Sequence, residues 1–434
     1  MARLPDTRAA LFDFALLPLQ RFSLPNGLRV VVHVDRRLPL VAVNLWYGVG
    51  SKHELPGRTG LAHLFEHMLF QGSAHVETNG HFRHLQSIGG VANGSTWYDR
   101  TNYYETVPSG ELDRALWLES DRMGYLLEAL DQRKLDNQRD VVLNERRQTV
   151  DNRPYARPYE RLFELLVPPD HPYHWPVIGR PEDIAAATLD DVREFFRTWY
   201  CPNNAVLTLA GDVDPDDARS KVEHWFGDLP GGSPPPRRRH LLPPREDAVR
   251  ETVSDEVRLP RIYLAFRTPP FGEADWYDGS LLASVLADGR TSALYRDLVW
   301  ERQLAQEVAA YLYPTVELGV FVVYATARPN VEPERLAEAL RLHLDATASP
   351  PPSDALERAR NRTLHAIWER LETLDDRADR ISMHTSLFDR PEDTWSEPAR
   401  VAAADADRLA RFGRDFLASA RAVELTVLPR ERGR

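Results

Sequence analysis

Cysteine is nearly absent from this chain of 434 residues, in which Cys201 stands alone. A single cysteine excludes any disulfide within the chain, and nothing here points to an oxidising compartment. We expect Cys201, in the segment WYCPNN, to be a small buried or half-buried residue rather than a nucleophile.

Long apolar runs and an excess of positive charge are also missing. No stretch reaches the roughly 18 apolar residues that a membrane-spanning helix needs, so we expect no transmembrane segment. The weak apolar patch at the N-terminus is interrupted by Asp6 and Asp13 and is not typical of a signal peptide. The net charge of −11 disfavours binding to nucleic acid or to an anionic membrane surface. A cytoplasmic location is therefore the default expectation.

The composition is that of an ordinary soluble protein, with 43% hydrophobic and 27% charged residues. The length suggests about two to four domains. Residues 229–245 concentrate proline, glycine and charge, including the run Arg237, Arg238 and Arg239. Such a segment is stiff and poor in packing groups, so it predicts a solvated linker between domains at 1–228 and 246–434.

Strand and helix patterns occur in both halves of the chain. Runs rich in β-branched and aromatic residues predict strands at 27–34, 41–47, 204–213, 262–266 and 319–327. Apolar residues at helical spacing predict helices at 60–70, 111–130, 278–292, 333–347 and 353–372. The two types do not strictly alternate, which favours α+β sandwiches over a doubly wound sheet.

The two halves look related to each other. In each, a strand leads through a polar loop of similar length into a helix. An offset of 219 residues aligns these segments, and the polar residues of the first helix then stand opposite apolar ones: His63, Glu66 and His67 against Leu282, Val285 and Leu286. One similar segment is weak evidence for duplication. If the duplication is real, the second copy shows the same helix as plain apolar core.

The helix at 60–70 carries the most informative residues of the chain. His63 and His67 are four residues apart, so their imidazoles lie on one helix face and can bind one metal ion. Glu66 is one residue off that axis and can reach a water on the metal without binding the metal. Zinc lowers the pKa of its bound water to about 7. The motif therefore predicts a metal-assisted hydrolase with Glu66 as its general base.

A structural explanation of the motif stays open beside the metal site. Two core histidines could be satisfied by hydrogen bonds, with Glu66 at the rim of the helix, although the spacing favours the metal. The nearby His75, His81 and His84 lack this placement, and we expect them in loops or at the surface. Catalytic zinc usually takes three protein ligands, so a third must come from elsewhere in the chain.

H-x-x-E-H is the inverted zinc-protease motif. Here it stands in GRTGLAHLFEHMLFQGS and is followed by the segments at 89–108 and 138–150, GGVANGSTWYDRTNYYETVP and QRDVVLNERRQTV. Together these resemble the M16 metallopeptidases, and the chain length is similar to that of the M16B branch. The resemblance implies two homologous sheet-plus-helix domains that form half of a clamshell. The zinc-binding catalytic domain would be residues 1–228, and residues 246–434 would form a domain without zinc.

The resemblance also assigns further site residues. It implies that Glu145, in VVLNE, is the third zinc ligand. Without it, Glu145 would be an ordinary exposed helical glutamate beside Arg146 and Arg147. Active relatives often carry a supporting glutamate seven residues earlier, where this chain has Gln138, which brings no charge to the outer shell of the site.

The segment NGSTWYDRTNYY is similar to the edge strand that holds the substrate in the family. Asn93, Gly94 and Thr96 occupy the matching positions. A peptide added to a sheet edge gains main-chain hydrogen bonds whatever its side chains, so the resemblance implies extended or unfolded peptide substrates. The family's substrate-binding Arg and Tyr are replaced by Val299 and Gln306. A partner subunit of M16 type without zinc would then supply them. A homodimer of this chain stays open as the alternative assembly.

The sequence therefore predicts a zinc-dependent endopeptidase in which Glu66 activates a zinc-bound water, and which is the catalytic subunit of a heterodimer. Two alternatives stay open. One is a non-catalytic scaffold or interaction subunit of the same fold, although its relatives usually have a degraded motif. The other is a zinc amidase acting on small substrates, which the edge-strand segment and the large two-half plan disfavour.

Overall fold

The computed structural model describes residues 18–236 and 240–430. The N-terminal segment that we do not assign as a signal peptide, and the arginine run of the predicted linker, lie outside the described residues. Within the described ranges, no helix combines the length and the apolar character that crossing a bilayer requires.

The chain folds into two compact units that do not follow the order of the sequence. The first comprises residues 1–144, 176–237 and 367–396, and the second comprises 145–175, 238–366 and 397–434. Each unit thus takes in a segment from the other half of the chain. The division into domains at 1–228 and 246–434 stays a prediction.

The first unit contains a six-stranded sheet. Its strands are β1 (Leu19–Ser23), β2 (Arg29–Val34), β3 (Leu40–Tyr47), β4 (Val91–Thr96), β5 (Thr101–Pro108) and β6 (Ala205–Gly211). The spatial order is β1-β2-β6-β3-β5-β4, and only the β2–β6 pair is parallel. In the described residues β4 therefore lies at a sheet edge, as the sequence predicts for this segment.

One face of this sheet is covered by helices that share an apolar core with it. They are α2 (Leu61–Met68), α3 (Gly80–Gln86), α4 (Leu112–Ala129), α5 (Gln132–Arg146), α7 (Pro181–Ala186), α8 (Leu189–Trp199) and α9 (Pro215–Phe226). The central strands β3 and β6 are buried along nearly their whole length. Such near-continuous apolar strands are typical of a sheet that is covered on both faces.

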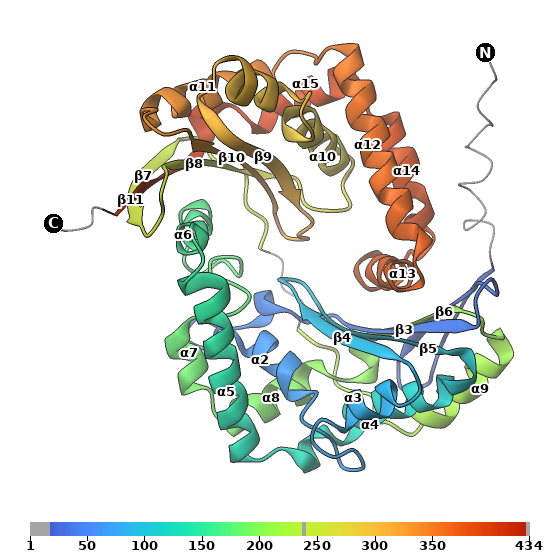
Figure 1. The fold of residues 1–434 in the computed structure, drawn as a ribbon. Helices are drawn as coiled ribbons and strands as arrows, with labels where there is room; N and C mark the ends of the chain where they lie inside the picture. The colour runs from blue at the N-terminus through green and yellow to red at the C-terminus, as the bar shows by residue number, and fades with distance from the viewer. Residues whose placement is uncertain (1–17, 237–239, 431–434) are drawn as a thin grey trace, which may run out of the picture. The chain divides into compact units, whose positions relative to one another are not determined.

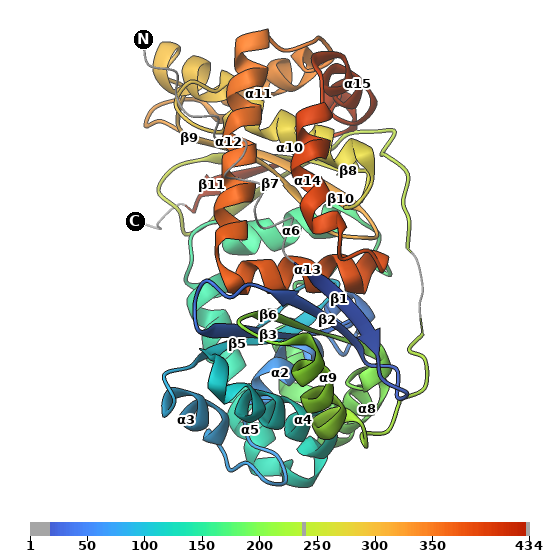
Figure 2. The same cartoon turned by 90° about the vertical axis from the view of Figure 1, so that its right-hand side faces the viewer.

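The other face carries α13 (Leu374–Phe388), which comes from the second half of the sequence and lies across the strands in both views (Figures 1 and 2). Small residues allow a close approach, because Ala42 of β3 and Ala210 of β6 pack against Ala378. The buried guanidinium of Arg377 lies 2.6 Å from the Asp35 carboxylate. Helix α13 is therefore held by paired polar groups as well as by apolar contacts.

The second unit repeats this plan with five strands. They are β7 (Val249–Asp255), β8 (Arg261–Thr268), β9 (Ala305–Tyr313), β10 (Gly319–Ala327) and β11 (Val423–Pro429), in the order β7-β11-β8-β10-β9. This order matches β2-β6-β3-β5-β4, and β7 and β11 form the parallel pair that corresponds to β2 and β6. The prediction of two homologous α+β halves is confirmed.

Helices of the second unit are α6 (Ala156–Leu166), α10 (Ala274–Ala287), α11 (Pro333–Ala346), α12 (Ser353–Glu372), α14 (Asp393–Ala403) and α15 (Ala406–Phe416), of which α12 and α14 run on into the first unit. Helices α10, α11 and α15 lie on one face of its sheet, and α6 lies on the other (Figure 1). Helix α6 comes from the first half of the sequence, so each sheet is covered by one helix from the opposite half.

Most predicted elements are confirmed to within a few residues. The exception is the helix predicted at 278–292, which begins at Ala274 and ends at Ala287. It cannot continue because Gly289 adopts φ +84°, a left-handed conformation. As predicted, Leu282, Val285 and Leu286 of this helix are buried, and so is Cys201.

Candidate active site

Helix α2 separates apolar and titratable side chains onto different faces. Its buried residues are Leu61, Ala62, Leu64, Phe65 and Met68. His63, Glu66 and His67 are only half-buried, because they lie on the face that turns away from this apolar stripe. The three polar residues thus share one accessible helix face.

The start of α2 is fixed by a carboxylate and by two glycines. The buried Glu54 accepts hydrogen bonds from the backbone N–H of Gly60 at 2.9 Å and of Ala62 at 2.8 Å. A negative charge at a helix N-terminus is favourable because it satisfies orphan donors and complements the helix dipole. Gly60 and Gly179 both adopt positive φ, and a Cβ on Gly179 would lie 2.4 Å from Gly60 Cα. The sequence contained no recognisable signal for this capping role of Glu54.

Helix α5 carries Glu145 to the histidines. Leu135 and Val142 anchor this helix in the core of the first unit, and Gln138 lies buried on the same face, two turns before Glu145. Just beyond it, Arg146 donates to both carboxylate oxygens of Glu160, at 2.8 and 2.7 Å. Because α5 is one continuous helix, these contacts on either side fix the position of its last turn.

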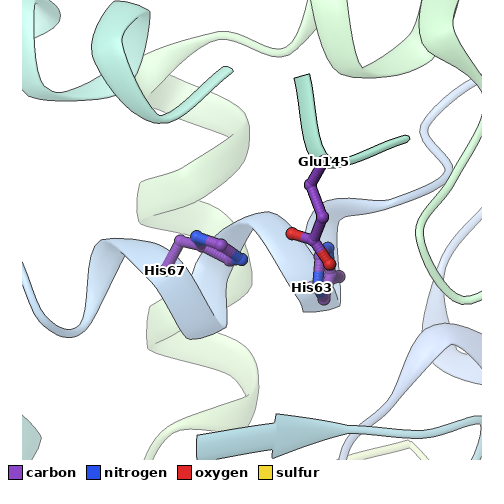
Figure 3. A group of neighbouring side chains, drawn as sticks. All are labelled: His63, His67 and Glu145. Carbon is purple, nitrogen blue, oxygen red and sulfur yellow. The ribbon is translucent and has the colours of Figure 1, made fainter. Parts of the chain in front are cut away.

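The structure brings His63, His67 and Glu145 together. One ligand atom from each residue lies within 4.8 Å of those of the other two. The two imidazole rings are 4.9 Å apart between centroids, and Glu145 points its carboxylate toward them (Figure 3). Two imidazoles and one carboxylate form a donor set known from catalytic zinc sites. Ligand atoms around a tetrahedral zinc are about 3.4 Å apart, so small rotations of these side chains suffice to bind it.

Glu66 is tied to the edge strand β4. The Thr96 hydroxyl donates a hydrogen bond of 2.6 Å to Oε2 of Glu66. A Cβ on Gly94 would lie 3.2 Å from Glu66 Cγ and 3.3 Å from its Oε1. Gly94 and Thr96 are two residues apart in the strand, so both face α2. Asn93 is exposed, and its side chain accepts a hydrogen bond from the Gly94 N–H at 2.9 Å.

The two positions that depart from the family pattern lie in the second unit. Val299 is buried in the short π-helical segment Tyr295–Glu301, and Gln306 is exposed on β9. Neither side chain offers the charge or the phenol that the family uses for substrate at these positions.

The prediction for His81 is wrong, because this residue lies buried in α3. It belongs to a second group, in which ligand atoms of His81, Glu105 and Glu119 lie within 4.8 Å of one another. Its Nε2 is 3.9 Å from Oε2 of Glu105. His84 lies half-buried in the same helix, and His75 lies in an exposed loop as expected.

A charge count indicates that this second group holds a proton rather than a metal ion. Arg122 pairs with both carboxylate oxygens of Glu119, and in the described residues no donor reaches either oxygen of Glu105. Burial, together with the neighbouring charge of Glu119, raises the pKa of the Glu105 carboxyl well above its usual range. Burial also lowers the pKa of His81 well below its usual value. With one proton on Glu105, the charges of Glu119 and Arg122 cancel and the group is neutral. A divalent ion would instead add positive charge beside Arg122.

Two family profiles match this sequence. The profile described as "Insulinase (Peptidase family M16)" matches residues 29–166, and the one described as "Peptidase M16 inactive domain" matches residues 186–363. The zinc protease PqqE of Helicobacter pylori is 32% identical over 321 residues, which are 72% of this chain and 71% of the relative.

Solved structures share the fold over almost the whole chain. A protease from Helicobacter pylori has a TM-score of 0.88 and 26% identity, with 95% of this chain and 100% of that chain covered. The periplasmic protease PqqL from Escherichia coli has a TM-score of 0.76 and 20% identity. There the match covers 95% of this chain but 48% of that chain.

The duplicated α+β plan, the paired histidines and these relatives define a peptidase with an N-terminal and a C-terminal domain of common origin. The chain belongs to peptidase family M16, as its sequence motifs predict. The names of its relatives support a zinc-dependent peptidase in general terms.

Proposed function

We propose that this chain is a zinc-dependent endopeptidase for extended or unfolded peptides. The observation that carries the proposal is the convergence of His63, His67 and Glu145, whose ligand atoms lie within 4.8 Å of one another. Glu66 shares the half-exposed face of α2 with the two histidines. A hydrolase needs this combination of a metal-binding group and a nearby general base.

His63, His67 and Glu145 would hold the zinc ion. The bound ion would supply a Lewis acid that acidifies a coordinated water and polarises the scissile carbonyl. Glu66 takes up a proton from the attacking water at its carboxylate and later returns it to the nitrogen of the leaving amine. Gln138, buried on the same face of α5 as Glu145, would support the ligand helix without adding charge.

The edge strand β4 would bind the substrate. It pairs with β5 on one side only in the described residues, and its position beside α2 would bring a bound peptide next to Glu66. A peptide that adds to this edge is recognised through main-chain N–H and C=O groups around Asn93, Gly94 and Thr96. Such binding requires an extended substrate and tolerates many side chains.

A second chain would complete the substrate site. Val299 and Gln306 provide neither of the two substrate-binding groups that the family pattern has at these positions. The match covers 48% of the PqqL chain, so PqqL is about twice as long as the part that this chain matches. We therefore propose a partner of M16 type that lacks zinc, with this chain as the catalytic subunit of a heterodimer. A homodimer is the alternative assembly, but it would leave the substrate site without these two groups, because each copy carries Val299 and Gln306.

The proposal is tested with a quenched-fluorescence peptide of about 15 residues. The purified chain is assayed alone and with a co-expressed zinc-less homologue, each with and without a chelator. We expect cleavage that the chelator abolishes and that the partner increases, and little turnover of a dipeptide amide. Cleavage that survives the chelator would refute zinc dependence, and full activity of a strict monomer would refute the need for a partner.

Glu66→Gln tests the role of the general base. We expect the variant to keep its zinc and to lose about 10²- to 10⁴-fold in turnover, the usual contribution of a general base. Glu182→Gln is the matched control, because Glu182 is an exposed residue of α7. Full turnover in Glu66→Gln would rule out its role, and a wild-type chain that binds no zinc would favour a scaffold subunit.

A further inference from the structure

The carboxylate of Glu66 is held by strand β4 as well as by its own helix. The hydrogen bond from Thr96 Oγ1 to Glu66 Oε2 is 2.6 Å long. Hydrogen bonds from a hydroxyl to an ionised carboxylate are typically 2.5–2.7 Å long and about twice as strong as neutral ones. This contact therefore has the geometry of a charge-assisted bond, and it ties the candidate base to the candidate substrate strand.

Neighbouring groups show which residue is the donor in this hydrogen bond. Thr101 donates its hydroxyl proton to the carbonyl oxygen of Val49 at 2.9 Å. The Thr96 and Thr101 hydroxyl oxygens are 3.4 Å apart, at the outer limit of hydrogen bonding. Because each hydroxyl has one proton, the proton of Thr101 is engaged at Val49 and that of Thr96 is available to Glu66. Thr96 therefore donates, and Oε2 accepts.

The two oxygens of Glu66 are thereby made different. Oε2 is engaged by Thr96, whereas Oε1 lies beside Gly94, where a Cβ would stand only 3.3 Å away. A glycine at this position leaves space next to Oε1 that any side chain would reduce. Gly94 therefore places no side chain against Oε1, so β4 holds this carboxylate through the Thr96 hydroxyl.

We propose that Thr96 is a positioning residue, which fixes the Glu66 carboxylate through its hydrogen bond to Oε2. This inference rests on the proposed function. In this account the Thr96 side chain acts by holding Glu66, while the substrate would contact β4 through main-chain groups.

The test compares kcat, KM and zinc content of Thr96→Val, Thr96→Ser and the wild type. Valine keeps the shape of threonine but cannot donate, and we expect kcat to fall about 10- to 100-fold, with KM and zinc content unchanged. Serine keeps the hydroxyl and should restore kcat close to the wild-type value. Thr198→Val on α8 is the matched control, because in the part of the chain that the structure describes the Thr198 hydroxyl donates to the Glu194 carbonyl oxygen of its own helix.

A double variant separates this role from direct substrate binding. In the Glu66→Gln background, Thr96→Val should cause no further loss of the residual turnover, because the base it positions is gone. An equal loss in both backgrounds, a rise in KM with unchanged kcat, or unchanged kcat in Thr96→Val would each overturn the positioning role. These outcomes leave the proposed function intact if Glu66→Gln itself is inactive. Full activity of Glu66→Gln would overturn the proposed function and the role of Thr96 together.

Discussion

The buried carboxyl group of Glu105 should make the protein less stable as the pH rises, and glutamine at this position should remove that dependence. Glu105 lies on β5 beside Glu119, whose two carboxylate oxygens are already paired with Arg122. Its own oxygens have no donor among the described residues. Burial raises the pKa of Glu105 well above its usual range, so the folded protein holds a proton that the unfolded chain releases.

The size of the effect follows from proton linkage. The pKa of Glu105 is raised on folding, so its contribution to stability is fully present below the unfolded pKa of about 4.3 and is lost as the pH rises. Between the unfolded and the folded pKa, folding takes up one proton, and the free energy of unfolding falls by about 1.4 kcal/mol per pH unit. Glu105→Gln takes up no proton. The free energy of unfolding of the variant, relative to that of the wild type, should therefore rise by about 1.4 kcal/mol with each pH unit in this interval.

Urea-induced unfolding of both proteins at successive pH values upward from about pH 5, just above the unfolded pKa, measures this difference. Each variant is compared with the wild type at the same pH. This comparison cancels the contributions of groups that titrate in both proteins, including His81. Glu182→Gln is the surface control and should follow the wild type at every pH. A stability difference between Glu105→Gln and the wild type that stays constant at every pH from about 5 upward would refute the buried proton.

Three further predictions concern packing and the metal site. Asp35→Asn removes the carboxylate that lies 2.6 Å from the buried guanidinium of Arg377 and should lower the free energy of unfolding by about 3–5 kcal/mol, measured by urea titration. Gly60→Ala should lower the melting temperature markedly, because φ is +86° there and the new Cβ would lie 2.8 Å from the carbonyl oxygen of Ile178. Gln138→Glu adds a carboxylate to the buried face of α5 and should slow zinc loss to a chelator. An unchanged rate would exclude an influence of this position on the metal.

Much of the candidate site could be predicted because its signals are local. The spacing of His63 and His67 sets their common face through helix geometry alone, and the apolar stripe of α2 shows which face is buried. The edge position of β4 follows the family pattern of the segment at 89–108. Glu145 could be named only through that pattern, since nothing within α5 distinguishes it from an exposed helical glutamate.

The features that the sequence did not reveal depend on long-range packing. An amphipathic helix shows which of its faces is buried but not which sheet covers it, so the exchange of α6 and α13 between the two sheets could not be predicted. The burial of His81 could not be predicted, because the residues close to it, among them Glu105 of β5 and Glu119 of α4, are distant in the sequence. The bond from Thr96 to Glu66 depends on where β4 lies beside α2, which no local pattern gives.

The most direct test of the metal site is a zinc titration of the metal-stripped chain, because it requires neither a substrate nor a partner. Our account predicts one tightly bound zinc per wild-type chain. Glu145→Ala should weaken the binding by orders of magnitude, while Glu182→Ala should not alter it. A wild-type chain that binds no zinc, or a Glu145→Ala variant that binds it as tightly as the wild type, would contradict the convergence of His63, His67 and Glu145 on one ion.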